Sequence, residues 1–263
     1  MSLITLLTDF GEQDGYTGAM KGVIYGIDPS LTVVDISHKI PPGDITAAAF
    51  VLNSTYGYFP AGTIHVIVVD PGVGSERKAL CMVTAEYTFI APDNGVLQWI
   101  SKRYPDALIY SIENDGYFHK PVSHTFHGRD IFAPVAAHLS RGVAPETLGP
   151  QLDRIQHGVM PECLQLGDIL TGEVVYIDHF GNLISNIPEK FLQGKPVHSI
   201  HIGNTVLRTI DSTYSSVLLG YPLALVGSHG MLEIAVRGGN AAECLNINKH
   251  SRILVQFIGN PHE

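Results

Sequence analysis

Residues 63–77, TIHVIVVDPGVGSER, join the most apolar stretch of the chain to a loop that is rich in glycine and charge. The apolar run over residues 63–69 is typical of a strand in a sheet that is covered on both faces. Asp70, two glycines and Arg77 follow at the end of that strand. Open α/β sheets place their ligands just beyond the carboxyl ends of their strands. This segment therefore predicts both a fold class and the position of a site.

Strand-like and helix-like stretches alternate on both sides of this segment. Strands are expected at residues 4–7, 32–36, 80–84 and 87–91, and helices at 15–27, behind the caps Asp44 and Asp93, and at 129–141. Strands that alternate with helices predict an α/β domain with a mainly parallel sheet. We expect this N-terminal catalytic domain to occupy residues 1–163.

The pattern changes after about residue 165. Strand-like stretches separated by Gly and Asn turns, without a convincing helix, follow at residues 172–178, 197–202, 205–210, 223–226, 232–236 and 252–258. Short strands joined by such turns predict a smaller all-β barrel domain. We expect it to span residues 168–263 and to contribute to a binding site.

Composition excludes several classes of protein. The net charge of -9 argues against a nucleic-acid partner, which would need clustered Lys and Arg. The sequence contains no run of eighteen apolar residues, so no membrane span is predicted. The residues after Met1 lack the basic region of a signal peptide. A cytoplasmic location is the default expectation. Cys81, Cys163 and Cys244 are too widely spaced for a disulfide framework or a zinc knuckle, so buried free thiols are expected.

Two polar clusters follow predicted strands in the first domain. Asp9, within residues 8–11 and close to Asp14, could accept one hydroxyl of a ribose on each carboxylate oxygen, although a cap and a turn explain this cluster more readily by itself. Asp70 beside Arg77 would stay ionised. A structural ion pair between Asp70 and Arg77 explains this loop equally well. The loop also lacks the full glycine signature of a phosphate-binding loop.

A third cluster contains three histidines, His119, His124 and His127, followed by Arg129 and Asp130. Such a density of histidine suggests a metal site with Asp130 as a carboxylate ligand. The H-E-x-x-H spacing is absent, however, and Arg129 and Asp130 are well explained as residues at a helix terminus. Histidines that bind no metal are therefore the favoured interpretation.

The fourth cluster lies in turns of the second domain. Phe180 could stack on a planar base, and Asn182 could bond the edge of that base. The glycine-rich turns at residues 227–230 and 237–242 could present backbone donors to a carboxylate. Alternatively, these glycines, asparagines and aspartates simply form the turns of the barrel.

In combination, these motifs resemble the S-adenosylmethionine hydroxide adenosyltransferases, which are related to fluorinating and chlorinating enzymes. The resemblance is carried in order along the chain by residues 8–11, 69–74 with Arg77, 91–95, 126–130, 178–182, 227–228 and 237–242. It implies an N-terminal α/β domain, a C-terminal β-barrel and a homotrimer with active sites between subunits. It also implies hydrolysis of S-adenosylmethionine to adenosine and methionine, with no cofactor and no metal.

The resemblance assigns a role to individual residues. Asp70, Arg77 and His127 correspond to a triad that handles the attacking water, and whether His127 or Asp70 accepts the proton stays open. The resemblance implies that Asp9 contacts the ribose hydroxyls, that Asp14 contacts the methionine amino group and that Ser228 contacts the methionine carboxylate. The residues implied around the adenine are Phe180, Asn182, Arg237 and Ala242. Asn94 is implied as a further residue that binds the substrate.

Water is favoured over halide as the nucleophile. In the halogenating relatives the places of Asp70 and His127 hold tyrosine and serine, whereas a carboxylate would repel chloride or fluoride. The short segment over residues 82–90 also leaves no room for their extra loop. One departure from the fluorinating enzymes is Gly43, which stands where they have a tryptophan over the substrate. The alternatives are a halide-using relative, a metal-dependent hydrolase and a non-catalytic protein that binds S-adenosylmethionine.

Overall fold

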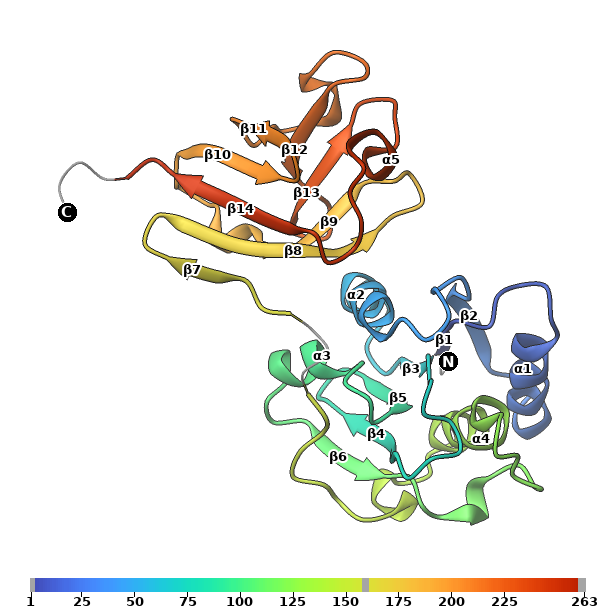
Figure 1. The fold of residues 1–263 in the computed structure, drawn as a ribbon. Coiled ribbons are helices and arrows are strands. Elements are labelled where there is room, and N and C mark those ends of the chain that lie inside the picture. Colours follow the sequence, from blue (N-terminus) through green and yellow to red (C-terminus); the bar gives the residue numbers. More distant parts are fainter. Residues whose placement is uncertain (1–2, 158–160, 260–263) are drawn as a thin grey trace. The chain divides into compact units, whose positions relative to one another are not determined.

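The computed structural model describes residues 3–157 and 161–259 and divides the chain into two compact units, residues 1–160 and 161–263 (Figure 1). The first unit combines helices with a six-stranded sheet, and the second is built around an antiparallel sheet. The two-domain architecture expected from the sequence is therefore confirmed.

The sheet of the first unit is mixed. Its strands are β1 (Leu3–Thr8), β2 (Thr32–Ser37), β3 (Ile64–Val68), β4 (Ala79–Val83), β5 (Thr88–Pro92) and β6 (Leu108–Ser111), in the order β2-β1-β3-β5-β4-β6. Strand β1 is parallel to β2 and β3, and β3 is parallel to β5. Strand β4 is antiparallel to both of its neighbours. Every residue of β3 is buried, as expected for a strand covered on both faces.

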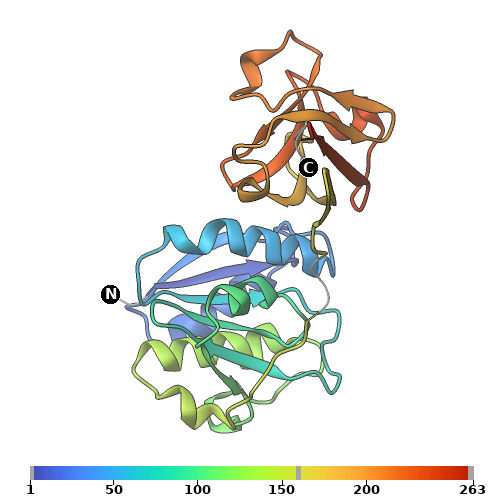
Figure 2. The same ribbon diagram turned by 90° about the vertical axis from the view of Figure 1, so that its left-hand side faces the viewer.

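Helices cover this sheet. They are α1 (Tyr16–Ile27), α2 (Ile45–Thr55), α3 (Gln98–Arg103) and α4 (Ala133–Ser140). Helices α1 and α4 pack together on one side, and α2 lies on the other side with α3 in contact (Figures 1 and 2). Helix α1 buries Met20 and Ile24, which lie one turn apart on the same face.

One predicted cap is present and the other is wrong. Asp44 accepts a hydrogen bond from the Ala47 amide at 2.9 Å and so caps α2. Asp93 does not cap α3, which begins five residues later at Gln98. The buried Asp93 carboxylate instead accepts from the amide of Gln156 at 2.7 Å. A distant backbone donor has replaced the local one that the sequence predicted.

The second unit contains eight antiparallel strands. They are β7 (Leu164–Leu166), β8 (Ile169–Ile177), β9 (Leu183–Pro188), β10 (Val197–Ile202), β11 (Thr205–Leu207), β12 (Pro222–Val226), β13 (Met231–Val236) and β14 (Arg252–Phe257). The main order runs from β11 at one edge to β12 at the other. Just after β11, the Asp211 amide donates to Ala224 in β12 at 2.7 Å. This bond brings the two edges together and makes the sheet nearly barrel-shaped.

Two expectations require correction. A short helix, α5 (Ala241–Leu245), lies between β13 and β14, where no helix was expected. Cys244 is exposed and Cys163 only partly buried, so only Cys81 is the fully buried thiol expected from the sequence. Within residues 3–157 and 161–259, helices are too short or too polar to cross a membrane.

Candidate active site

The loop after β3 folds back on itself and forms an ion pair. Arg77 Nε lies 3.0 Å from both carboxylate oxygens of Asp70, and Nη2 also donates to Oδ2. The Arg77 and Asp70 side chains are only 9% and 4% exposed. Gly74 has a φ of +77° and lies so close to the His124 carbonyl that a Cβ would collide with it. Glycine at this position therefore lets the loop lie against the segment that carries His127.

His127 approaches this pair from a segment fifty residues further along the chain. It immediately precedes a π-helical turn, Gly128–Phe132, that leads into α4. A Cβ on Gly128 would lie 3.2 Å from Met20 Sδ and 3.3 Å from the Phe10 ring, so the backbone packs closely here. In this position, His127 Nδ1 lies 2.7 Å from Arg77 Nη2.

This contact fixes the position of the imidazole proton. An arginine guanidinium has only donors, so Nδ1 of His127 must accept. The proton of the neutral ring then lies on Nε2. Burial lowers the pKa of His127, and the charge of Arg77 lowers it further, while Asp70 and Asp130 oppose both effects. His127 is therefore a neutral imidazole that presents an Nε2–H.

Asp70 and His127 line a pocket of about 320 Å³ that also contains Asp9. Asp9 Oδ2 accepts from the Gly43 amide at 2.8 Å. The remaining wall is largely apolar and is formed by Phe10, Pro42, Gly43, Val68, Pro71, Val73, Thr125, Phe126 and Gly128. The pocket thus combines two carboxylates and an imidazole with an apolar surround, which is typical of a small-molecule site.

Several pocket residues were not singled out from the sequence. Phe10 and Phe126 lie inside quoted motifs but carry no ionisable group, so only a structure reveals their part in the wall. Their rings pack edge-to-face at 5.6 Å, and Tyr16 contacts Phe126 at 5.2 Å. This aromatic cluster joins the loop after β1 to the segment that holds His127.

Two predicted substrate contacts of the first domain lie outside this pocket wall. Asp14 is exposed on the bend before α1. Asn94 donates to the Val69 carbonyl at 2.9 Å and accepts from the Val96 amide at 3.2 Å. Both ends of its amide are thus used within the chain. Asn94 holds the residue before Asp70 in place.

The histidine cluster is not assembled as a metal site. Asp130 has no exposed surface, forms an ion pair with Arg129 at 2.6 Å and accepts from the Ser123 amide at 2.8 Å. Among residues 3–157 and 161–259, no three His, Cys, Asp or Glu side chains lie together in a way that could hold a metal ion.

In the second unit, one carboxylate organises the turn that carries Phe180. Asp178 accepts from the amides of Phe180 and Asn182 at 2.9 and 2.8 Å and from the Asn182 side chain at 2.9 Å. Phe180 is 73% exposed. The Ala242 amide donates to the Gly181 carbonyl at 3.0 Å. The predicted residues Phe180, Asn182 and Ala242 therefore belong to one connected region.

The other two predicted contacts lie on separate turns of this unit. Ser228 is exposed in the turn between β12 and β13. Arg237 donates to the Val217 carbonyl at 2.7 Å, which holds the loop before β12. The side chain of Arg237 therefore has a structural partner inside its own domain.

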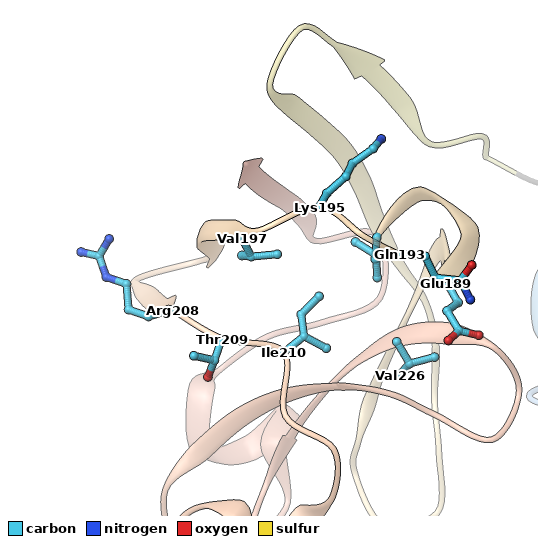
Figure 3. Close-up of a pocket in the computed structure, with 9 residues that line it drawn as sticks. Glu189, Gln193, Lys195, Val197, Arg208, Thr209, Ile210 and Val226 are labelled. Atoms are coloured by element: carbon cyan, nitrogen blue, oxygen red, sulfur yellow. The ribbon is translucent and has the colours of Figure 1, made fainter. Parts of the chain in front are cut away.

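A further pocket, of about 400 Å³, lies in the second unit (Figure 3). Its apolar residues include Val197, Ile210 and Val226, and the charged ends of Lys195 and Arg208 point away from them (Figure 3). Lys195 donates to the Gln165 side chain at 3.0 Å. No residue predicted from the sequence as a site residue lines this pocket.

Comparisons with known proteins agree over nearly the whole chain. Residues 4–149 match the model of the SAM hydroxide adenosyltransferase N-terminal domain, and residues 172–254 match that of the C-terminal domain. An (R)-S-adenosyl-L-methionine hydrolase from Thermus thermophilus is 35% identical and covers 95% of this chain and 97% of its own length. A fluorinase from Nocardia brasiliensis is 25% identical, with 93% of each chain covered.

The fold is shared with a solved structure. The crystal structure of an uncharacterized conserved protein from Thermotoga maritima is 38% identical and superposes with a TM-score of 0.89. That similarity covers 96% of this chain and 99% of the other.

Proposed function

Since the chain belongs to the family of SAM hydroxide adenosyltransferases, we propose that it is an enzyme that hydrolyses S-adenosyl-L-methionine to adenosine and L-methionine. Curated relatives that are about 35% identical over most of the chain are named as hydrolases of this compound. The structural observation that carries the proposal is the hydrogen-bonded set of Asp70, Arg77 and His127 at the wall of a pocket that also contains Asp9.

The reaction is a substitution at the 5′ carbon of the ribose. The oxygen of water forms a bond to this carbon while the carbon–sulfur bond breaks, and its electron pair returns to sulfur. Methionine leaves as a neutral thioether, so no acid is needed to protonate it. One proton must leave the attacking water. The site therefore needs a positioned nucleophile and a proton acceptor, and little else.

The tautomer of His127 decides between the two candidate acceptors. Nδ1 receives the bond from Arg77, and Nε2 already carries the proton of the neutral ring. His127 can therefore donate to a lone pair of the water, but it has no free nitrogen to take the proton. Asp70 Oδ1 receives one bond, from Arg77 Nε, and a carboxylate oxygen can accept a second. We assign proton acceptance to Asp70 and orientation of the water to His127.

Charge supports water rather than halide. Asp9 and Asp70 both line the pocket, and carboxylate oxygens repel a halide anion at short range. Arg77 neutralises Asp70 from the side of the protein interior, where both side chains are nearly buried. The remaining charge of Asp9 favours a positively charged substrate.

The remaining contacts are assigned from family membership and exposure. We assign Asp9 to the ribose hydroxyls, Asp14 to the methionine amino group and Ser228 to the methionine carboxylate. Phe180, which is exposed, would stack on the adenine. The same membership leads us to propose a cytoplasmic homotrimer, and measurement of the mass in solution tests the oligomeric state.

Product analysis tests the proposed function. The purified protein is incubated with S-adenosylmethionine in chelator, with and without chloride, and the products are separated by chromatography. We expect equal amounts of adenosine and methionine under both conditions. A 5′-chlorinated adenosine would assign halide chemistry, loss of activity in chelator would assign a metal mechanism, and unchanged substrate would leave a binding protein.

A further inference from the structure

His38, which directly follows β2, holds both ends of the segment that carries Asp9. Its ring nitrogen Nδ1 lies 2.9 Å from Thr8 Oγ1, and its backbone carbonyl accepts from the Gly11 amide at 2.8 Å. Thr8 and Gly11 lie on either side of Asp9 and Phe10. A single residue with a buried side chain therefore fixes this segment from both sides.

The Thr8 hydroxyl links His38 to the backbone of the same segment. Its Oγ1 accepts from the Phe10 amide at 3.3 Å, and the hydroxyl forms the 2.9 Å hydrogen bond with His38 Nδ1. A hydroxyl has one donor and two acceptor sites, so it serves both partners at once.

Asp35 faces the other nitrogen of the His38 ring. Its Oδ1 lies 3.0 Å from His38 Nε2, although without the alignment of a hydrogen bond. Burial raises the pKa of Asp35, but the bond from Lys21 and the contact with His38 outweigh it and hold the pKa below its ordinary value. Asp35 is therefore a carboxylate, which attracts a proton on the facing nitrogen.

The segment held in this way directs a carboxylate into the pocket. Asp9 lines the pocket together with Asp70 and His127, and its Oδ2 accepts from the Gly43 amide. Two adjacent hydroxyls can donate to the two oxygens of one carboxylate only if that carboxylate keeps its direction, because hydrogen bonds weaken steeply off their axis. Fixing the backbone on both sides of Asp9 supplies that direction.

We propose that His38 is a positioning residue that aims Asp9 at the vicinal hydroxyls of the ribose. The inference rests on the proposed function, because it takes the ligand of this pocket to be a nucleoside. His38 acts through Thr8 and Gly11.

Strand β1, which contains Thr8, also contains a threonine–histidine pair that serves as a matched control. Thr5 Oγ1 of β1 lies 2.8 Å from Nδ1 of His65 in β3, and both residues are fully buried. This is the same type of threonine–histidine pair, but neither member lines the pocket. Replacing His65 therefore reports the general cost of breaking such a pair, whereas replacing His38 also releases Asp9.

Calorimetric binding of adenosine and of 2′,3′-dideoxyadenosine tests the inference. The wild-type protein should bind adenosine roughly 10–100-fold more tightly, because a charged acceptor serves two hydroxyls. Asp9→Asn and His38→Gln should both reduce this ratio to below about threefold. His38→Asn places its amide near the position of Nδ1 and should retain most of the ratio, and His65→Gln should retain all of it.

Each other outcome overturns the inference. A wild-type ratio in His38→Gln would show that His38 does not position Asp9, and an equal loss in His65→Gln would show only general loosening. A ratio unaffected by Asp9→Asn would refute the diol contact and the inference with it, while the product assay would still decide the hydrolase activity. If His38→Gln does not fold, Thr8→Val removes the same link at nearly constant volume and gives the same test.

Discussion

Replacing Asp70 by asparagine is the sharpest test of its assignment as proton acceptor. The change removes the charge and nearly preserves the shape of the side chain. A positioned base contributes roughly 10²–10⁴-fold to the rate, so kcat should fall by about that factor. KM should stay within about threefold, because Asp70 is assigned to the water and not to the substrate.

The same substitution has a cost in stability that can be worked from the structure. Arg77 is only 9% exposed and would lose its charged partner. Breaking a buried ion pair outright costs about 3–5 kcal/mol. Because the asparagine oxygen still accepts from Arg77, we expect on the order of 2 kcal/mol, or a fall in Tm of roughly 4–8 °C for a domain of this size.

The assay is steady-state turnover of Asp70→Asn, with thermal unfolding measured on the same preparation. Hydroxide needs no base, so the residual activity of the variant should increase by about tenfold per pH unit while the protein stays folded. A folded variant with kcat within about threefold of wild type would refute the assignment. A normal kcat combined with a large rise in KM would place Asp70 at the substrate instead.

Substitutions at His127, His65 and Gly74 test separate parts of the structure. His127→Gln can still present an N–H near the position of Nε2, so its kcat should fall by less than about tenfold while that of His127→Ala falls by about 10²; equal losses would contradict the donor role. Burial lowers the pKa of His65 to about 4, against about 6.5 in the unfolded chain. The unfolded chain therefore binds this proton first, and the free energy of unfolding should decline by about 1.4 kcal/mol per unit as pH falls from about 6.5 to about 4. His65→Gln should remove that contribution in urea titrations, and an unchanged slope would argue against it. Gly74 combines a φ of +77° with a close approach to the His124 carbonyl, so Gly74→Ala should cost about 2 kcal/mol or more and lower kcat. Gly62, with a φ of +86° and open space, is the control: Gly62→Ala should cost about 1–2 kcal/mol and leave kcat unchanged, and equal kcat values for the two variants would contradict this account.

The parts of the fold that could be predicted are those whose signals are local. The apolar run of β3 and the cap Asp44 lie within a few residues of the element they define. The position of the pocket also followed from a general rule, since Asp9 and Asp70 lie within two residues of the ends of the parallel neighbours β1 and β3. Such strands end at the same edge of a sheet.

The elements that were missed depend on distant partners. Strand β9 contains Ser185 and Asn186, which interrupt its apolar run, yet both are buried because Ser185 bonds Leu232 and Asn186 bonds Glu173. Asp93 was predicted to cap a helix because its actual donor, the backbone amide of Gln156, is remote in sequence. No periodicity in the chain indicates bonds of this kind.

The same limit applies to the site. Motifs and family resemblance pointed to Asp70, Arg77 and His127, and the structure brings these three into contact. The tautomer of His127 and the hydrogen bond between His38 and the segment that carries Asp9 can be inferred only from distances between side chains. Proton positions follow from which neighbours can only donate, and that requires the folded arrangement.

Turnover of S-adenosylmethionine in water enriched in ¹⁸O tests the central claim most directly. Attack by water at the 5′ carbon of the ribose predicts adenosine that carries one ¹⁸O in its 5′ hydroxyl and methionine that carries none. Unlabelled adenosine, or label found instead in homoserine released together with methylthioadenosine, would contradict the proposed reaction.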